Sequence, residues 1–267
     1  MSALRLSPGR SVAAAPAENL TGPAISVDGV TKVYGPRGSH TFALDRISLE
    51  VAPGEFCCLV GASGCGKSTL LNLLAGLDTP AAGSVSVQGR TSLMFQESAL
   101  FPWLSVRGNI NLALRLAGIP KAERNDRASD LLRMVRLKGM GGKRPHELSG
   151  GMRQRVALAR ALAQNASVLL MDEPFGALDA ITRDLLHDEI ERVWQETGIT
   201  VVFVTHNVRE GVRLGDRVLV LSSRPGRVVD EFRVDTPRPR RLDDPEVSSL
   251  SGLITDRLRQ EVRRHGA

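Results

Sequence analysis

The stretch Gly61-Ala62-Ser63-Gly64-Cys65-Gly66-Lys67-Ser68 matches the pattern G-x-x-x-x-G-K-[ST]. It lies between an apolar run at 56–60 and a helical run at 69–75. Small residues let backbone N–H groups close around a phosphate, and the helix start adds the positive end of a dipole. In this pattern Lys67 reaches the β- and γ-phosphates and the Ser68 hydroxyl binds Mg²⁺. The stretch therefore predicts a nucleoside triphosphate site.

A second stretch, Val168-Leu169-Leu170-Met171-Asp172-Glu173, places two carboxylates after four apolar residues. This order is typical of a buried strand that delivers acids at its carboxyl end, the edge where ligands bind in parallel sheets. We expect Asp172 to hold the magnesium, directly or through water, and Glu173 to polarise the attacking water. A solvated acidic turn is the alternative, and the phosphate loop disfavours it. Both motifs together predict a nucleoside triphosphatase.

The third motif is Leu148-Ser149-Gly150-Gly151-Met152, which opens a helix with Ser149 as its expected N-cap. Backbone donors at this helix start form a second anion site. One nucleotide does not need two such sites in one subunit. We therefore expect the second site to act on the nucleotide of a neighbouring copy, in a head-to-tail dimer.

This Leu-Ser-Gly-Gly sequence resembles the signature of ATP-binding-cassette (ABC) proteins, and the resemblance covers about residues 25–222. It implies an α/β fold: a P-loop NTPase core with a mainly parallel sheet, an antiparallel β portion near the N-terminus and an inserted helical subdomain. The sequence departs from the family at Met152, where many members have glutamine, and at Asn207, where aspartate is common. Neither departure removes an expected catalytic group.

The resemblance also implies roles for single residues. Tyr34 would stack on adenine, although a lone tyrosine near a strand end is also ordinary packing. Gln96 would touch the magnesium and the attacking water, Asp179 would cross the dimer interface, and His206 would contact the γ-phosphate and support Glu173. The implied catalytic set is Glu173, His206, Lys67 and Gln96; the implied ATP-binding set is Tyr34, Gly61, Ala62, Ser63, Gly64, Cys65, Gly66, Lys67, Ser68 and Thr69. The implied metal ligands are Ser68, Gln96 and Asp172.

Short β-branched runs alternate with helical stretches, as in a largely parallel α/β sheet. The strands expected are 25–33, 56–60, 84–88, 168–172, 200–205 and 217–221. We expect a disordered leader at 1–23 and an ATPase domain at 24–222, with the helical subdomain at about 97–165. A C-terminal extension, ending in a charged helix from about Ser248, is expected at 223–267.

The composition excludes several classes of protein. No apolar stretch approaches the roughly 20 residues that span a bilayer, so we expect a soluble chain. The 3 cysteines lie too close together for a disulfide framework, which favours a reducing cytoplasm. The 35 basic and 29 acidic residues are interspersed, so the net charge of +6 gives no argument for nucleic acid. We expect Cys65 to be a small space-filling residue. Its place in the phosphate loop also predicts that thiol reagents inactivate the protein and that ATP protects against this inactivation.

The partners are read from a different segment. Phe101, Pro102 and Trp103 follow Gln96 and suit a docking groove for a helix of a membrane permease, or Trp103 packs the subdomain instead. With 223–229, this segment resembles the importer branch that handles small oxyanions. We favour aliphatic sulfonates, then taurine and nitrate, supplied through a separate solute-binding protein to a complex at the cytoplasmic face of the membrane. A non-transport ABC ATPase acting on nucleic acid or an assembly partner is the alternative.

Overall fold

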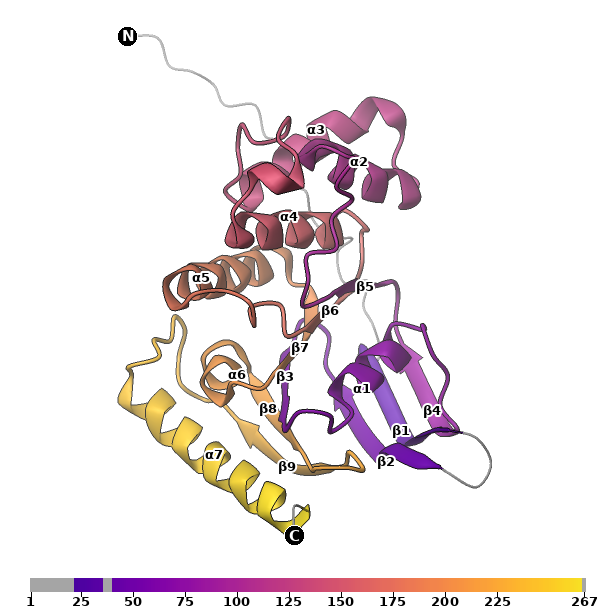
Figure 1. Cartoon of the computed structure of the whole chain (residues 1–267), viewed down its shortest axis with the longest axis vertical. Helices are drawn as coiled ribbons and strands as arrows, with labels where there is room; N and C mark the ends of the chain where they lie inside the picture. The colour runs from indigo at the N-terminus through magenta and orange to yellow at the C-terminus, as the bar shows by residue number, and fades with distance from the viewer. Residues whose placement is uncertain (1–21, 36–39, 266–267) are drawn as a thin grey trace.

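The computed structural model describes residues 22–35 and 40–265 of the 267-residue chain. Residues 1–21 of the leader expected at 1–23 lie outside the described residues. Two sheets and a set of helices make up the described part (Figure 1). The predicted fold class, α/β with a mainly parallel sheet and an antiparallel portion near the N-terminus, is confirmed.

The main sheet has the strand order β5-β6-β7-β3-β8-β9. Its strands are β3 (Phe56–Gly61), β5 (Thr91–Met94), β6 (Val168–Asp172), β7 (Thr200–Thr205), β8 (Arg217–Leu221) and β9 (Val228–Arg233). All neighbours are parallel except β8 and β9. Every residue of β3 and β7 is buried, because helices and the second sheet cover both faces of the parallel strands. The parallel register places the carboxyl ends of β3, β6 and β7 at one edge.

The second sheet is antiparallel, with the order β2-β1-β4. It contains β1 (Ile25–Tyr34), β2 (Thr41–Val51) and β4 (Ala82–Val87). Ile25, Leu44 and Ile47 point into a core shared with α1 (Lys67–Leu74), which lies between the two sheets. This packing fixes the position of β2 beside the loop that precedes α1.

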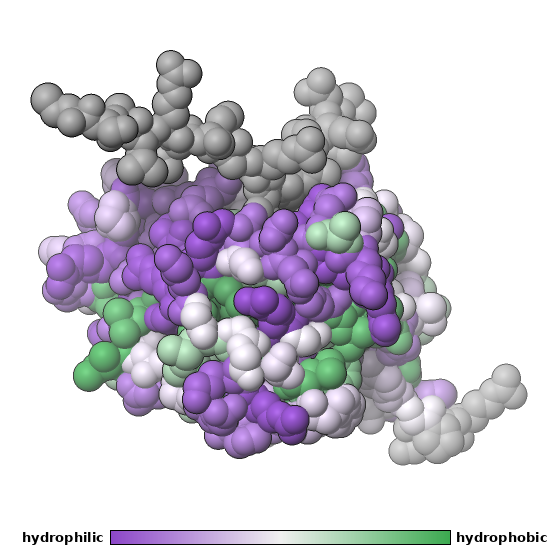
Figure 2. All heavy atoms as spheres, turned by 90° about the horizontal axis from the view of Figure 1, so that it is seen from above, coloured by the Kyte–Doolittle hydropathy of each residue, from purple (hydrophilic) through white to green (hydrophobic). Residues whose placement is uncertain are grey.

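Three α-helices and one short 3₁₀ helix occupy the interval between β5 and β6. They are α2 (Val106–Leu116), α3 (Lys121–Met134), η1 (Pro145–Glu147) and α4 (Gly150–Leu162). They project from the sheet at the top of Figure 1, where α3 and α4 pack on α2 and on each other. Seen from that end, the molecule is mainly hydrophilic with separate hydrophobic patches (Figure 2).

The remaining helices are α5 (Ala180–Thr197), α6 (Val208–Leu214) and α7 (Pro245–His265). α7 packs on α6 and β8 (Figure 1). Arg240, only 3% exposed, fastens the segment before α7 by donating to the carbonyl oxygens of Val212, Gly215 and Val234. No helix in the described part of the chain combines the length and apolar character needed to cross a bilayer.

Candidate active site

The loop between β3 and α1 is held in a conformation that requires glycine. Gly66 has a φ of 101°, and a Cβ there would lie 2.7 Å from the carbonyl oxygen of Ala43. The Lys67 side chain is 5% exposed and its Nζ donates to the carbonyl oxygens of Gly61, at 2.9 Å, and Ala62, at 3.0 Å. The loop therefore surrounds the lysine ammonium, and the first residues of α1 face the adjacent pocket.

Three charged or ionisable side chains from three neighbouring strands meet at this edge. Lys67 Nζ, after β3, lies 3.9 Å from Glu173 Oε1, after β6. Glu173 Oε2 lies 2.8 Å from His206 Nδ1, after β7. Glu173 has a φ of 44°, which is unfavourable for a residue with a side chain and costs about 1–3 kcal/mol. The sheet holds this strained residue in place because its N–H donates to the carbonyl oxygen of Val204.

Asp172, the last residue of β6, is next to the Ser68 hydroxyl. Burial raises the pKa of the Asp172 carboxyl, and a hydrogen bond with Ser68 opposes that rise. The structure thus brings Lys67, Ser68, Asp172, Glu173 and His206 together, as the sequence predicts.

A pocket of about 380 Å³ is lined by three of these residues, Lys67, Ser68 and Glu173. Its walls come from the phosphate loop and the start of α1, from Glu173, from β1 and β2, and from the loop after β8; they are Tyr34, Thr41, Phe42, Ala43, Ser63, Gly64, Gly66, Lys67, Ser68, Thr69, Glu173 and Arg224. Phe42 is 49% exposed and is, with Tyr34, one of two aromatic residues in the walls. The pocket therefore joins an apolar, aromatic end to a charged end.

Arg224 is a residue of this pocket that sequence reasoning missed. Its Nε donates to the carbonyl oxygen of Gly64 in the phosphate loop, at 2.9 Å. The loop that carries it is attached to β2, since Gly226 N–H donates to Ala43 and Asp45 N–H donates to Gly226. The sequence analysis used its segment, 223–229, only for the resemblance to an importer branch; the contacts with Gly64 and β2, made in the folded chain, reveal its place at the pocket.

Tyr34 is 43% exposed at the edge of the pocket. Its hydroxyl donates to Asp78 Oδ2 at 3.0 Å, and Lys32 Nζ contacts Asp78 Oδ1 at 2.5 Å. The hydrogen bond from Lys32 holds the pKa of Asp78 below its usual value. These contacts fix the tyrosine ring while leaving part of it accessible.

Gln96 lies at the junction of the core and the helical subdomain. Its carbonyl oxygen accepts a 2.7 Å hydrogen bond from Gln154 Nε2 of α4. A Cβ on Gly176, just after Glu173, would be 3.1 Å from Gln96 Nε2, so the amide faces the loop that follows the carboxylates. This glutamine is absent from the pocket walls in the described part of the chain.

The signature residues form a separate cluster with the loop before α5. Ser149 caps α4 by accepting from Met152 N–H at 3.3 Å, and Asp179 caps α5 by accepting from Thr182 N–H at 3.0 Å. Gly151 is packed so closely that a Cβ would lie 2.4 Å from Thr182 Cγ2. Among the described residues, those at 148–152 contribute nothing to the pocket that contains Lys67.

Cys65 is fully buried, and burial raises the pKa of its thiol. A Cβ on Gly61 would lie 2.6 Å from its Sγ, so the thiol fills space under the loop. The expected filler role fits this position. The expected inactivation by thiol reagents does not fit it, because rapid attack requires an accessible thiolate of low pKa, and this thiol is buried.

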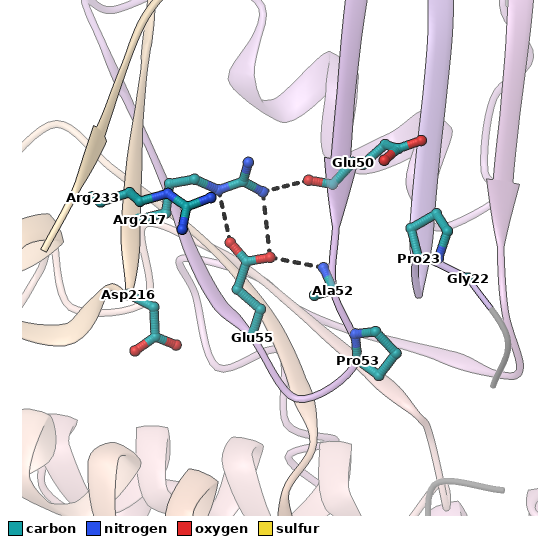
Figure 3. Close-up of a pocket in the computed structure, with 9 residues that line it drawn as sticks. All are labelled: Gly22, Pro23, Glu50, Ala52, Pro53, Glu55, Asp216, Arg217 and Arg233. Carbon is teal, nitrogen blue, oxygen red and sulfur yellow. Dashed lines mark hydrogen bonds and ion pairs between the residues drawn. The ribbon is translucent and has the colours of Figure 1, made fainter. Parts of the chain in front are cut away.

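A larger pocket, of about 510 Å³, lies at the amino ends of β3 and β8 (Figure 3). Glu55, at 2.7 Å, and the carbonyl oxygen of Glu50 both bind the guanidinium of Arg217, which therefore has its partners within the pocket wall. Asp216 accepts from the N–H of Phe56. This pocket lies at the amino ends of the strands, whereas the candidate residues follow the carboxyl ends.

The chain is similar to known proteins over most of its length. A family model described as ABC transporter matches residues 44–176. The taurine import ATP-binding protein of Burkholderia thailandensis is 48% identical, over 87% of this chain and 96% of its own length. The nitrate import ATP-binding protein of Synechocystis is 46% identical, over 88% and 95%. The chain belongs to the ABC transporter family. This ABC protein is an ATPase.

A solved structure supports the same assignment. It is described as a dimeric, post-hydrolysis state of an ATP-binding cassette bound to ADP and Pi, and it is 32% identical to this ABC protein. The TM-score is 0.70, with 80% of this chain and all of that chain covered.

Proposed function

We propose that this ABC ATPase hydrolyses ATP with Glu173 as the general base. The observation that carries the proposal is the contact of Glu173 with both Lys67, at 3.9 Å, and His206, at 2.8 Å. Glu173 would take the proton of the attacking water, His206 would hold the carboxylate in line, and Lys67 would bind the γ-phosphate oxygens. The exposed faces of Tyr34 and Phe42 suit adenine.

The residues present fit a magnesium ion. A hydroxyl (Ser68), a carboxylate (Asp172) and an amide (Gln96) are hard oxygen donors, and Mg²⁺ is commonly held by one or two such groups plus phosphates. The burial of Asp172, which raises its pKa, favours a cation beside it. When bound, Mg²⁺ would neutralise charge that develops on the phosphates. Ser68 and Asp172 would orient the ion. Gln96, which is hydrogen-bonded to α4, would connect the ion to the helical subdomain.

A head-to-tail dimer follows from the separation of the two clusters. The helix start at Ser149 and Gly151 lies outside the pocket of its own chain, where its free N–H groups would bind an anion. A second copy would present these residues to the γ-phosphate, and Asp179, which neighbours them, would cross the interface. The dimeric relative bound to ADP and Pi supports this arrangement.

The partner of the dimer would be a membrane permease. Trp103 is 68% exposed, which argues against its serving only to pack the subdomain. Phe101 lies beside it, with ring centroids 5.4 Å apart. A helix of the permease docked on these rings, and on Pro102 between them, would place this protein at the cytoplasmic face of the membrane. A solute-binding protein would act on the permease from the other side.

We place the transported molecule among small oxyanions, with aliphatic sulfonates first. Taurine is itself an aliphatic sulfonate, and the taurine import relative supports this class. The nitrate import relative supports nitrate as the second candidate. The proposed ATPase domain is 24–222, with the helical subdomain at 97–165 and the extension at 223–267.

The test is uptake of radiolabelled taurine, a longer alkanesulfonate and nitrate in cells that carry Lys67→Ala. The expected result is that uptake of the sulfonates is lost while uptake of nitrate stays normal. Lys138→Ala, which changes an exposed lysine of the helical subdomain, is the matched control and should leave uptake normal. Normal uptake of all three compounds in Lys67→Ala would contradict the oxyanion proposal. If the protein instead co-purified with a ribosome or DNA, and nuclease treatment abolished this co-purification, the partner would be nucleic acid and not a permease.

A further inference from the structure

A buried carboxylate lies behind the candidate catalytic histidine. Glu210 of α6 is 5% exposed. Thr205 Oγ1 donates to its Oε2 at 2.7 Å, and Asn207 Nδ2 donates to its Oε1 at 3.3 Å. Burial raises the pKa of this carboxyl, whereas the hydrogen bond from Thr205 favours the charged form.

The two donors stand immediately before and after His206 in the chain. They are also joined to each other, because Asn207 N–H donates to Thr205 Oγ1 at 3.0 Å. His206 itself is exposed, at 63% of its side chain, and contacts Glu173. Its direction therefore depends on the backbone on either side, which Glu210 holds at two points.

Glu210 also faces the loop at the start of α5. Arg183 Nε lies 3.6 Å from Glu210 Oε1, and Arg183 donates from its terminal nitrogen to the carbonyl oxygen of Leu178 at 2.9 Å. Leu178 precedes Asp179, the residue expected at the dimer interface. One carboxylate thus touches the segment of His206 directly and the segment of Asp179 through one arginine.

The other neighbour of Glu210 is His187, whose Nε2 lies 3.8 Å from Oε1. Arg213 donates to the opposite nitrogen, Nδ1, at 3.2 Å. Burial and the nearby arginines lower the pKa of His187 to about 3, so the ring is neutral. The neutral imidazole packs edge-on against Phe175, so it fills the space beside Glu210 without adding a positive charge that would compete for the carboxylate.

We infer that Glu210 is a positioning residue that directs His206 toward Glu173 and links its segment to the Asp179 loop through Arg183. This inference rests on the proposed catalytic roles of Glu173 and His206. It adds a residue that touches neither nucleotide nor water and acts through Thr205 and Asn207.

The test is steady-state hydrolysis of Mg-ATP by the full chain in three variants: Glu210→Ala, Thr205→Val and the double variant. Each single change should lower kcat by about 10- to 100-fold, because small displacements of a catalytic group cost that much. KM should stay within about threefold of the wild type, since no nucleotide contact is removed. The double variant should be no slower than the slower single variant, because both changes break one link.

Glu191→Gln is the matched control. Glu191 is also a buried glutamate paired with an arginine, Arg238 at 3.2 Å, but that arginine belongs to the segment between β9 and α7. It should keep a wild-type kcat. Equal loss of kcat in Glu191→Gln, losses that multiply in the double variant, or unchanged kcat in Glu210→Ala would overturn the inference.

Glu173→Gln and His206→Ala, measured in the same assay, separate this inference from the function it rests on. If both lose turnover while Glu210→Ala keeps it, only the positioning role is wrong. If either keeps turnover, the catalytic assignment itself fails. Should Glu210→Ala not fold, Glu210→Gln keeps the volume of the side chain and an acceptor for Thr205, and Thr205→Val alone still has to show the fall in kcat at constant KM.

Discussion

Glu173 Oε2 and His206 Nδ1 lie 2.8 Å apart although 33 positions separate these residues in the chain. Adjacent parallel strands create this contact, because β6 ends at Asp172 and β7 at Thr205, at the same edge. The carboxylate is oriented by one neighbour that can carry a proton and by one cation, Lys67.

Glu173→Gln should therefore bind ATP and hydrolyse it roughly 10²- to 10⁴-fold more slowly, since the amide cannot accept the proton of water. Nucleotide binding and phosphate release, measured on the same preparation, check this. Glu196→Gln, at an exposed glutamate of α5, is the control with full activity. Hydrolysis by Glu173→Gln at a near-normal rate would remove the residue from the role of base.

Arg224→Ala should weaken ATP binding while leaving kcat unchanged. The guanidinium lines the pocket and is tied to Gly64, so its loss should cost about 1 kcal/mol, or about fivefold in KM. Arg227→Ala is the comparison, because Arg227 is in the same loop and pairs with Asp45 instead. An equal rise of KM in both variants would indicate a general disturbance of the loop.

The thiols should react slowly in the native protein. Cys57, Cys58 and Cys65 are all buried, and burial raises the pKa of Cys57 to about 12. A chromogenic disulfide should therefore detect 3 thiols in denaturant and no rapid thiol without it. Fast modification of Cys65 that ATP blocks would show that the phosphate loop opens in solution.

Trp103→Ala should uncouple the ATPase from its membrane partner. The ring is exposed and does not line the pocket that contains Lys67, so ATP hydrolysis by the isolated chain should be unchanged while co-purification with the permease falls. Leu116→Ala removes another exposed apolar side chain, at the last residue of α2, and should have no effect. Full retention of the permease by Trp103→Ala would exclude this surface.

Arg240→Ala should destabilise the fold by about 3 kcal/mol, because it leaves several buried carbonyl oxygens without donors. The free energy of unfolding in denaturant measures this. The neighbouring Arg241 is exposed and pairs with Asp243 and Asp244 of its own turn, so Arg241→Ala should change stability by less than about 0.5 kcal/mol. Similar losses in both would mean that charge, not the buried bonds, is responsible.

The long buried strands of the main sheet were predictable, but the short parallel strand Thr91–Met94 was missed, and of the half-exposed strands only those expected at 25–33 and 84–88 were predicted. Continuous apolar runs predict 168–172, 200–205 and 217–221 with the bounds that the structure has. Thr41–Val51 and Val228–Arg233 were missed because charged residues interrupt their apolar pattern and only one face is buried.

The same limit applies to the site. Lys67 and Glu173 were predictable, since a loop pattern and a strand end place them. Arg224 and Glu210 were not, because one stands in a turn and the other in a short helix, where a glutamate ordinarily faces water. Their roles depend on contacts between segments that only the folded chain brings together.

The separation of Ser149 and Gly151 from the pocket of their own chain has a consequence for the cell. In the proposed head-to-tail dimer, a copy without a neighbour would hold one half of each of two composite sites, so we expect surplus copies to store nucleotide without consuming it. Production of this subunit then need not match that of its membrane partners closely. The rate per chain should rise with chain concentration in dilute solution, and a constant rate would mean that each copy is catalytically complete.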